Sequence, residues 1–183
     1  MQAAPPDRAD WIVRGLAVAG LAGILACIAG GVGARMAMRL FAIAVGQSTA
    51  FTIEGSMFIV VFGLLFGPAL AVGYVLVHRV VPGPWPLRGL LYGAALAGLE
   101  VLAFSGAPVD EAGPNPTLGT GLFATLAVLL GLVIAGATAW LERRLATPAA
   151  TPGLLTGVGA LIGALGALLL SALLLSAAIG FVD

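Results

Sequence analysis

The stretch Gly153–Val182, GLLTGVGALIGALGALLLSALLLSAAIGFV, contains no charged side chain and decides the fold class of this chain. About 20 helical residues cross the hydrocarbon core of a bilayer, so this stretch is long enough to span it with some tilt. Four further apolar stretches precede it, over residues 12–33, 56–77, 87–105 and 118–141. We therefore expect five membrane-spanning helices.

The composition of the chain agrees with this interpretation. Its 183 residues are 61% hydrophobic and 9% charged, with a mean hydropathy of +1.13, whereas soluble domains carry about 25% charged residues. The apolar stretches are continuous and rich in Leu, Ala and Gly, without the period-two alternation of a membrane β-barrel. The sequence predicts an all-α integral membrane protein: a flexible N-terminus over residues 1–10 and one five-helix transmembrane domain over residues 11–183.

The arginines predict the orientation of this domain. With five spans, one side of the membrane receives six arginines, and the other receives Arg35 and Arg39. The six are Arg8, Arg14, Arg79, Arg88, Arg143 and Arg144. Because cytoplasmic loops carry the excess of basic residues, we expect a bacterial plasma-membrane protein with its N-terminus in the cytoplasm and its C-terminus outside.

A few charged residues fall close to the outer part of the membrane. Arg35 and Arg39 are four residues apart, so they share a helical face, on a continuation of the first span or on a short interfacial helix. Glu100 follows Arg88 by about 18 Å of helix, which places it inside the hydrocarbon. We expect Arg35, Arg39, Glu54 and Glu100 to form a charge network that links spans one to three. The arginines alternatively extend to lipid phosphates, and the network serves either as a structural link or as part of a proton or ion path.

Small residues predict where the helices pack. Three GxxxG pairs are typical of close helix contacts in lipid: Gly63 and Gly67, Gly89 and Gly93, and Gly159 and Gly163. Packing within one bundle is the simpler interpretation, and oligomerisation or docking to another membrane protein is the alternative. Pro68 interrupts the second span and predicts a kink there.

No pattern in the chain indicates catalysis. The chain has a single cysteine, Cys27, and a single histidine, His78. It therefore cannot form an internal disulfide or a metal site built from several Cys or His ligands. The sequence contains none of the hydrolase, phosphate-binding or metalloprotease motifs, and no basic block for nucleic acid. We expect no catalytic residues, no metal and no cofactor. The expected partners are the lipid bilayer and either a second copy or another membrane protein.

The stretch Gly30–Arg39, GGVGARMAMR, followed by Phe51–Ser56, FTIEGS, resembles small multi-pass membrane proteins of GC-rich bacteria such as actinobacteria. That family has no assigned activity, so the resemblance implies a shared architecture and no chemistry. Two functions stay open. The first is a non-enzymatic membrane subunit or scaffold; the second is a small transporter or channel with a charged site in the outer half of the membrane.

Overall fold

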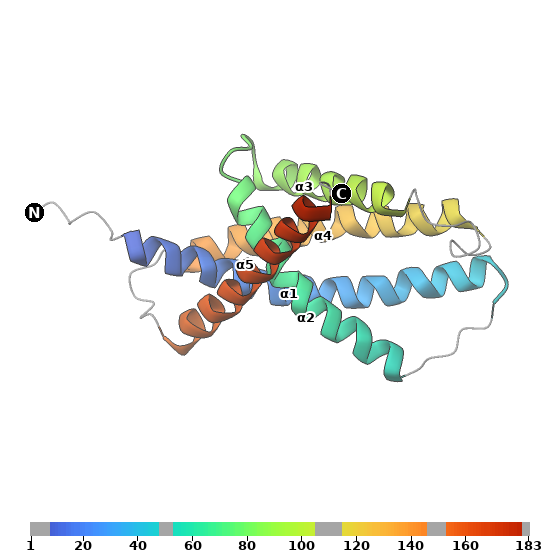
Figure 1. Ribbon diagram of the computed structural model, residues 1–183, viewed down its shortest axis with the longest axis horizontal. Helices are drawn as coiled ribbons and strands as arrows, with labels where there is room; N and C mark the ends of the chain where they lie inside the picture. The colour runs from blue at the N-terminus through green and yellow to red at the C-terminus, as the bar shows by residue number, and fades with distance from the viewer. Residues whose placement is uncertain (1–7, 48–52, 105–114, 146–152, 181–183) are drawn as a thin grey trace, which may run out of the picture.

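The computed structural model describes residues 8–47, 53–104, 115–145 and 153–180, and its regular structure there is entirely α-helical (Figure 1). The helices are α1 Arg8–Ala44, α2 Ile53–Val77, α3 Trp85–Phe104, α4 Pro116–Leu145 and α5 Leu154–Gly180. Within the described ranges, four segments are long and apolar enough to cross a membrane: Asp10–Ala44, Ile59–Val77, Pro116–Leu145 and Leu154–Ser176. The chain is therefore a multi-pass helical membrane protein. Helix α3, with 20 residues that include Arg88 and Glu100, is not among these four.

Helix α1 is longer than the first expected span. Its 37 residues extend over about 55 Å, so Arg35 and Arg39 belong to the same helix as the membrane span. The separate interfacial helix considered above is not formed, because no proline interrupts α1 before its end. Gly46 ends the helix with a φ of +71°, and the Gln47 amide donates to the Ala42 carbonyl across 2.8 Å. This is the usual glycine-dependent helix terminus.

Helix α1 runs along the long axis of the molecule (Figure 1). Helix α1 packs against α2, α4 and α5, while α3 packs along α4. Helix α5 crosses α1 and α2 obliquely, and α1 and α2 diverge from their crossing toward the end that holds the N-terminus of α2 (Figure 1). The buried core is made largely of small residues of α1, such as Ala19 and Ala22, and of Tyr74 and Ile134.

Glycines allow the helix backbones to approach one another. A Cβ on Gly93 would lie 2.6 Å from the Cα of Val128, and a Cβ on Gly67 would lie 2.5 Å from the main-chain oxygen of Gly23. All six glycines of the three GxxxG pairs lie at contacts between helices of this chain. Gly63 and Gly67 face α1, Gly89 and Gly93 face α4, and Gly159 and Gly163 face α1.

Pro68 lies at the point where three helices cross. Helix α2 runs through Pro68 from Ile53 to Val77, and Pro68 is buried. A Cβ on Gly23 of α1 would lie 2.6 Å from the Pro68 nitrogen, and one on Gly166 of α5 would lie 2.8 Å from the Pro68 Cβ. The proline ring therefore fills a space between two glycines of neighbouring helices.

Candidate functional site

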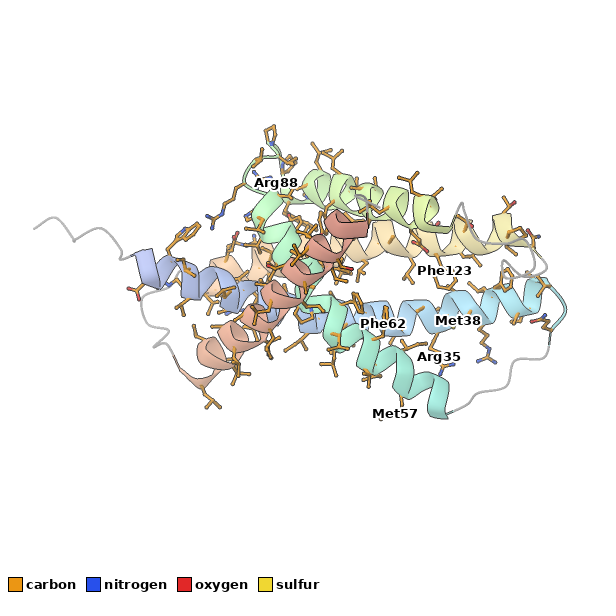
Figure 2. The ribbon with its side chains drawn as sticks, in the orientation of Figure 1. Arg35, Met38, Met57, Phe62, Arg88 and Phe123 are labelled. Atoms are coloured by element: carbon orange, nitrogen blue, oxygen red, sulfur yellow. The ribbon has the colours of Figure 1, made fainter. Side chains whose placement is uncertain are left out.

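The structure contains a partly open cavity of about 460 Å³ that is lined by α1, α2, α3 and α4. This volume falls in the range of small-molecule sites, roughly 300–1,000 Å³. Figure 2 shows Phe62 between α1 and α2, and Phe123 extending from α4 toward α1. The lining residues are Ala26, Cys27, Gly30, Gly31, Ala34, Met38, Ile59, Phe62, Gly63, Phe66, Gly67, Leu70, Leu96, Glu100, Phe123, Leu126, Ala127 and Leu130.

Among the described residues that line this cavity, Glu100 is the one that carries a charge. It lies on α3, and its side chain is half-buried. Among the residues that the structure describes, no hydrogen bond or ion pair of the Glu100 carboxylate is found. A carboxylate inside a bilayer would cost roughly 2.5–3.5 kcal/mol on insertion scales, so Glu100 is a candidate functional residue if α3 crosses the membrane.

A hydrogen bond between α2 and α3 closes one end of the cavity. The Tyr92 hydroxyl donates to the main-chain carbonyl of Leu70, a lining residue, across 2.7 Å. The Tyr74 ring meets the Tyr92 ring edge-on, with centroids 5.4 Å apart. Gly73 leaves the room for this contact, since a Cβ there would lie 2.9 Å from the Tyr92 hydroxyl oxygen.

Cys27 forms part of the wall between α1 and α2. Its thiol is buried and donates weakly to the Val60 carbonyl, with sulfur and oxygen 3.8 Å apart. A Cβ on Gly63 would lie 2.7 Å from the sulfur, so the thiol fills the space that this glycine leaves. Cys27 is thus a small packing residue in the α1–α2 contact.

The four residues of the predicted charge network occupy different positions. Arg35 is half-buried on α1 and lies on the side of α2, whereas Arg39 is exposed (Figure 2). Glu100 lines the cavity. Glu54 belongs to the first turn of α2, and its side chain lies outside the described part of the structure.

Sequence reasoning missed a polar contact at the opposite end of the bundle. His78, which follows α2, is buried and contacts α4. Its Nε2 lies 3.4 Å from Oε1 of Glu142, its Nδ1 lies 2.9 Å from the Val75 carbonyl, and its ring stacks on Tyr74. No spacing in the sequence pairs His78 with Glu142, because the contact depends on how α4 lies against α2.

The described residues contain no group of three or more His, Cys, Asp or Glu side chains that could hold a metal ion. The cavity itself offers apolar and aromatic contact surface and one carboxylate. This arrangement can bind an apolar or amphipathic body and accept a hydrogen bond or a positive charge from it.

In comparisons with known proteins, a short part of the chain is similar in sequence to a transporter. The probable nitrate/nitrite transporter NarK2 from two strains of Mycobacterium tuberculosis is 42% identical over 73 residues. The match covers 40% of this chain and 17% of the transporter, so the shared segment is a small part of that protein. No family model and no solved structure matches the chain. The comparisons therefore show a weak partial similarity and assign no activity, in keeping with the resemblance to uncharacterised multi-pass proteins.

Proposed function

We propose that this protein is a non-enzymatic membrane subunit that binds a membrane partner at the cavity. In this proposal α3 also crosses the bilayer, which gives five spans in a bacterial plasma membrane, with the N-terminus in the cytoplasm. The partner inserts an apolar segment with one hydrogen-bond donor or cation, which reaches Glu100.

One observation carries this proposal: a four-helix cavity with an almost wholly apolar lining and a single carboxylate. Ion paths need a continuous series of polar groups or water, and the described part of this lining offers a charge at Glu100 alone. Aromatic side chains such as Phe62, Phe66 and Phe123 instead give large apolar contact area, which suits a helix or another apolar body.

Filling the cavity tests this proposal. A Cβ on Gly31 would be in ordinary contact with Ile59, at 3.5 Å, so Gly31→Leu adds volume at the lining without a backbone clash. Gly98 on α3 lies outside the lining and has no atom within 4 Å of its Cβ position, so Gly98→Leu is the matched control.

The measurement is native mass spectrometry of the tagged protein after mild-detergent extraction from its own membrane. We expect a stoichiometric partner with the wild type and Gly98→Leu, and its loss with Gly31→Leu. A wild-type protein that is extracted alone and intact contradicts the subunit function, and so does a partner retained equally by both variants.

A second function, a small transporter or channel, has its own support. Glu100 lines a cavity, and in a five-span arrangement it is an intramembrane carboxylate of the kind that occurs in proton and ion paths. The partial similarity to a probable nitrate/nitrite transporter also fits transport. The negative charge of a carboxylate favours a proton or a cation at this position over an anion.

Proteoliposomes distinguish this second function from the first. A potassium gradient with valinomycin imposes a membrane potential, and an internal dye reports proton entry. Transport through the cavity requires faster entry than in empty liposomes, and a return to the empty-liposome rate with Glu100→Gln. Equal rates in wild-type and empty liposomes exclude proton conduction, and the subunit proposal is unaffected by that result.

A further inference from the structure

Two smaller cavities adjoin each other at the opposite end of the bundle, where α1 begins and α2 ends. One has a volume of about 120 Å³, and its lining includes the charged residues Arg14, Arg79 and Glu142. The other has a volume of about 370 Å³ and a nearly apolar lining. Trp11, Gly15, Val75 and Arg79 line both cavities, so the two spaces share a wall and lie side by side.

The smaller cavity favours an anion. Its lining includes two guanidinium groups and one carboxylate, so positive side chains outnumber negative ones, and the Glu142 Oε1 also lies 3.4 Å from the His78 Nε2. The Arg79 guanidinium lies over the Trp11 ring, 4.0 Å from its centroid, and this cation–π contact restricts its position. Arginine binds phosphate oxygens with its planar fork of donors, so a phosphate group is the anion that fits best.

The larger cavity requires that the anion carry an apolar chain. Its lining is completed by side chains such as Ile12, Leu16, Val72 and Leu76 from α1 and α2. A free phosphate leaves this space unused, whereas a phospholipid fills both spaces at once. Trp11, with 54% of its surface exposed, stands at the boundary between them, the position that tryptophans take at a membrane interface.

We propose that the two cavities form one binding site for an anionic phospholipid. The phosphate lies against Arg14 and Arg79, and an acyl chain lies in the apolar space between α1 and α2. The site belongs to the end of the bundle with the excess of arginines, where a lipid of negative charge is attracted by the surrounding residues as well. It is independent of the function proposed for the Glu100 cavity.

Two kinds of substitution test the two halves of the site. Arg14→Gln and Arg79→Gln remove the contacts to phosphate. Arg144→Gln is their control, because Arg144 lies over Trp140 at 5.7 Å as Arg79 lies over Trp11, yet it lines neither cavity. Gly15→Leu fills the shared wall, and its Cβ position has no atom within 4 Å. Gly157→Leu is the control for the added leucine, since Gly157 also has open space around it and lines neither cavity.

The full chain, purified in mild detergent and monodisperse on size exclusion, is mixed with phosphatidylglycerol, phosphatidylcholine or inorganic phosphate. Native mass spectrometry then counts bound molecules. We expect retention of phosphatidylglycerol over phosphatidylcholine, a loss of about fivefold in its affinity with each of Arg14→Gln and Arg79→Gln, and a loss below about twofold with Arg144→Gln. Gly15→Leu abolishes lipid retention, and Gly157→Leu does not.

Three results would overturn the proposal. Equal retention of phosphatidylglycerol and phosphatidylcholine contradicts selectivity for an anionic headgroup. Displacement of phosphatidylglycerol by millimolar inorganic phosphate shows that the site binds free phosphate. Full lipid retention by Gly15→Leu places the bound lipid elsewhere, and this variant stays informative even where an arginine variant fails to fold.

Discussion

The hydroxyl of Tyr92 on α3 donates a hydrogen bond to the main-chain carbonyl of Leu70 on α2, with the two oxygens 2.7 Å apart. The major packing surfaces of these two helices lie elsewhere, with α2 against α1 and α5 and α3 against α4. We call α1, α2 and α5 one half of the bundle and α3 and α4 the other. The bond links these two halves at the end of the Glu100 cavity.

Removing this hydroxyl should loosen the link between the halves. We expect Tyr92→Phe to lower the free energy of unfolding by about 0.5–1.5 kcal/mol, because one hydrogen bond is lost and the ring remains. The measurement is reversible unfolding in mixed micelles of increasing denaturing detergent. Tyr74→Phe is the control, because the substituted residue keeps its aromatic ring in contact with the rings of Tyr92 and His78. A loss in the control as large as in Tyr92→Phe contradicts the assignment.

Two glycines of α3, one at a close helix contact and one in open space, allow the effect of packing on stability to be distinguished from the effect of helix propensity. A Cβ on Gly93 would lie 2.6 Å from the Cα of Val128, so Gly93→Ala should destabilise the bundle by about 1–3 kcal/mol. Gly98 has no atom within 4 Å of its Cβ position, so Gly98→Ala should be neutral or stabilise by up to about 1 kcal/mol. The same unfolding assay compares the two variants. Equal changes in the free energy of unfolding for Gly93→Ala and Gly98→Ala would show that α4 can move away from α3 at little cost, which contradicts a tight backbone contact at Gly93.

The charge network of Arg35, Arg39, Glu54 and Glu100 stays a prediction, and a double-mutant cycle tests its first link. We expect Arg35→Gln and Glu54→Gln to couple by more than about 0.5 kcal/mol, because an arginine near the hydrocarbon needs an acidic partner. The control cycle combines Arg35→Gln with Glu142→Gln. Glu142 lines a cavity together with Arg14 near the start of α1, and Arg35 lies about 30 Å further along that helix. If the changes in free energy of unfolding caused by Arg35→Gln and Glu54→Gln are additive, the predicted interaction between these two residues is wrong.

The number of spans decides on which side the chain ends. If α3 crosses the bilayer, alkaline phosphatase fused after Asp183 should be active, while a fusion in the α2–α3 turn at Pro82 should be inactive. A cytoplasmic reporter such as a fluorescent protein should show the reverse pattern at both positions. Inactive phosphatase at both positions would mean that α3 lies at the interface and that four helices cross.

The sequence by itself determined the class of the protein and most of its helices. Charge-free stretches such as Gly153–Val182 must be covered by lipid and must satisfy their backbone groups internally, and only a helix does both within one segment. Even the GxxxG pairs could be read from the chain, because small residues at that spacing lie on one helical face.

Only the tertiary structure decided which of these faces meet and what they leave open. Gly67 faces α1 and Gly93 faces α4, so α2 and α3 belong to different halves of the bundle, and a cavity that contains Glu100 lies between the halves. The pairing of His78 with Glu142 and of Trp11 with Arg79 likewise depends on how distant helices are placed. The physical reason is that helix formation is local in the sequence. Helix packing in lipid instead depends on the fit between surfaces far apart along the chain, since burial from water does not select one apolar face over another.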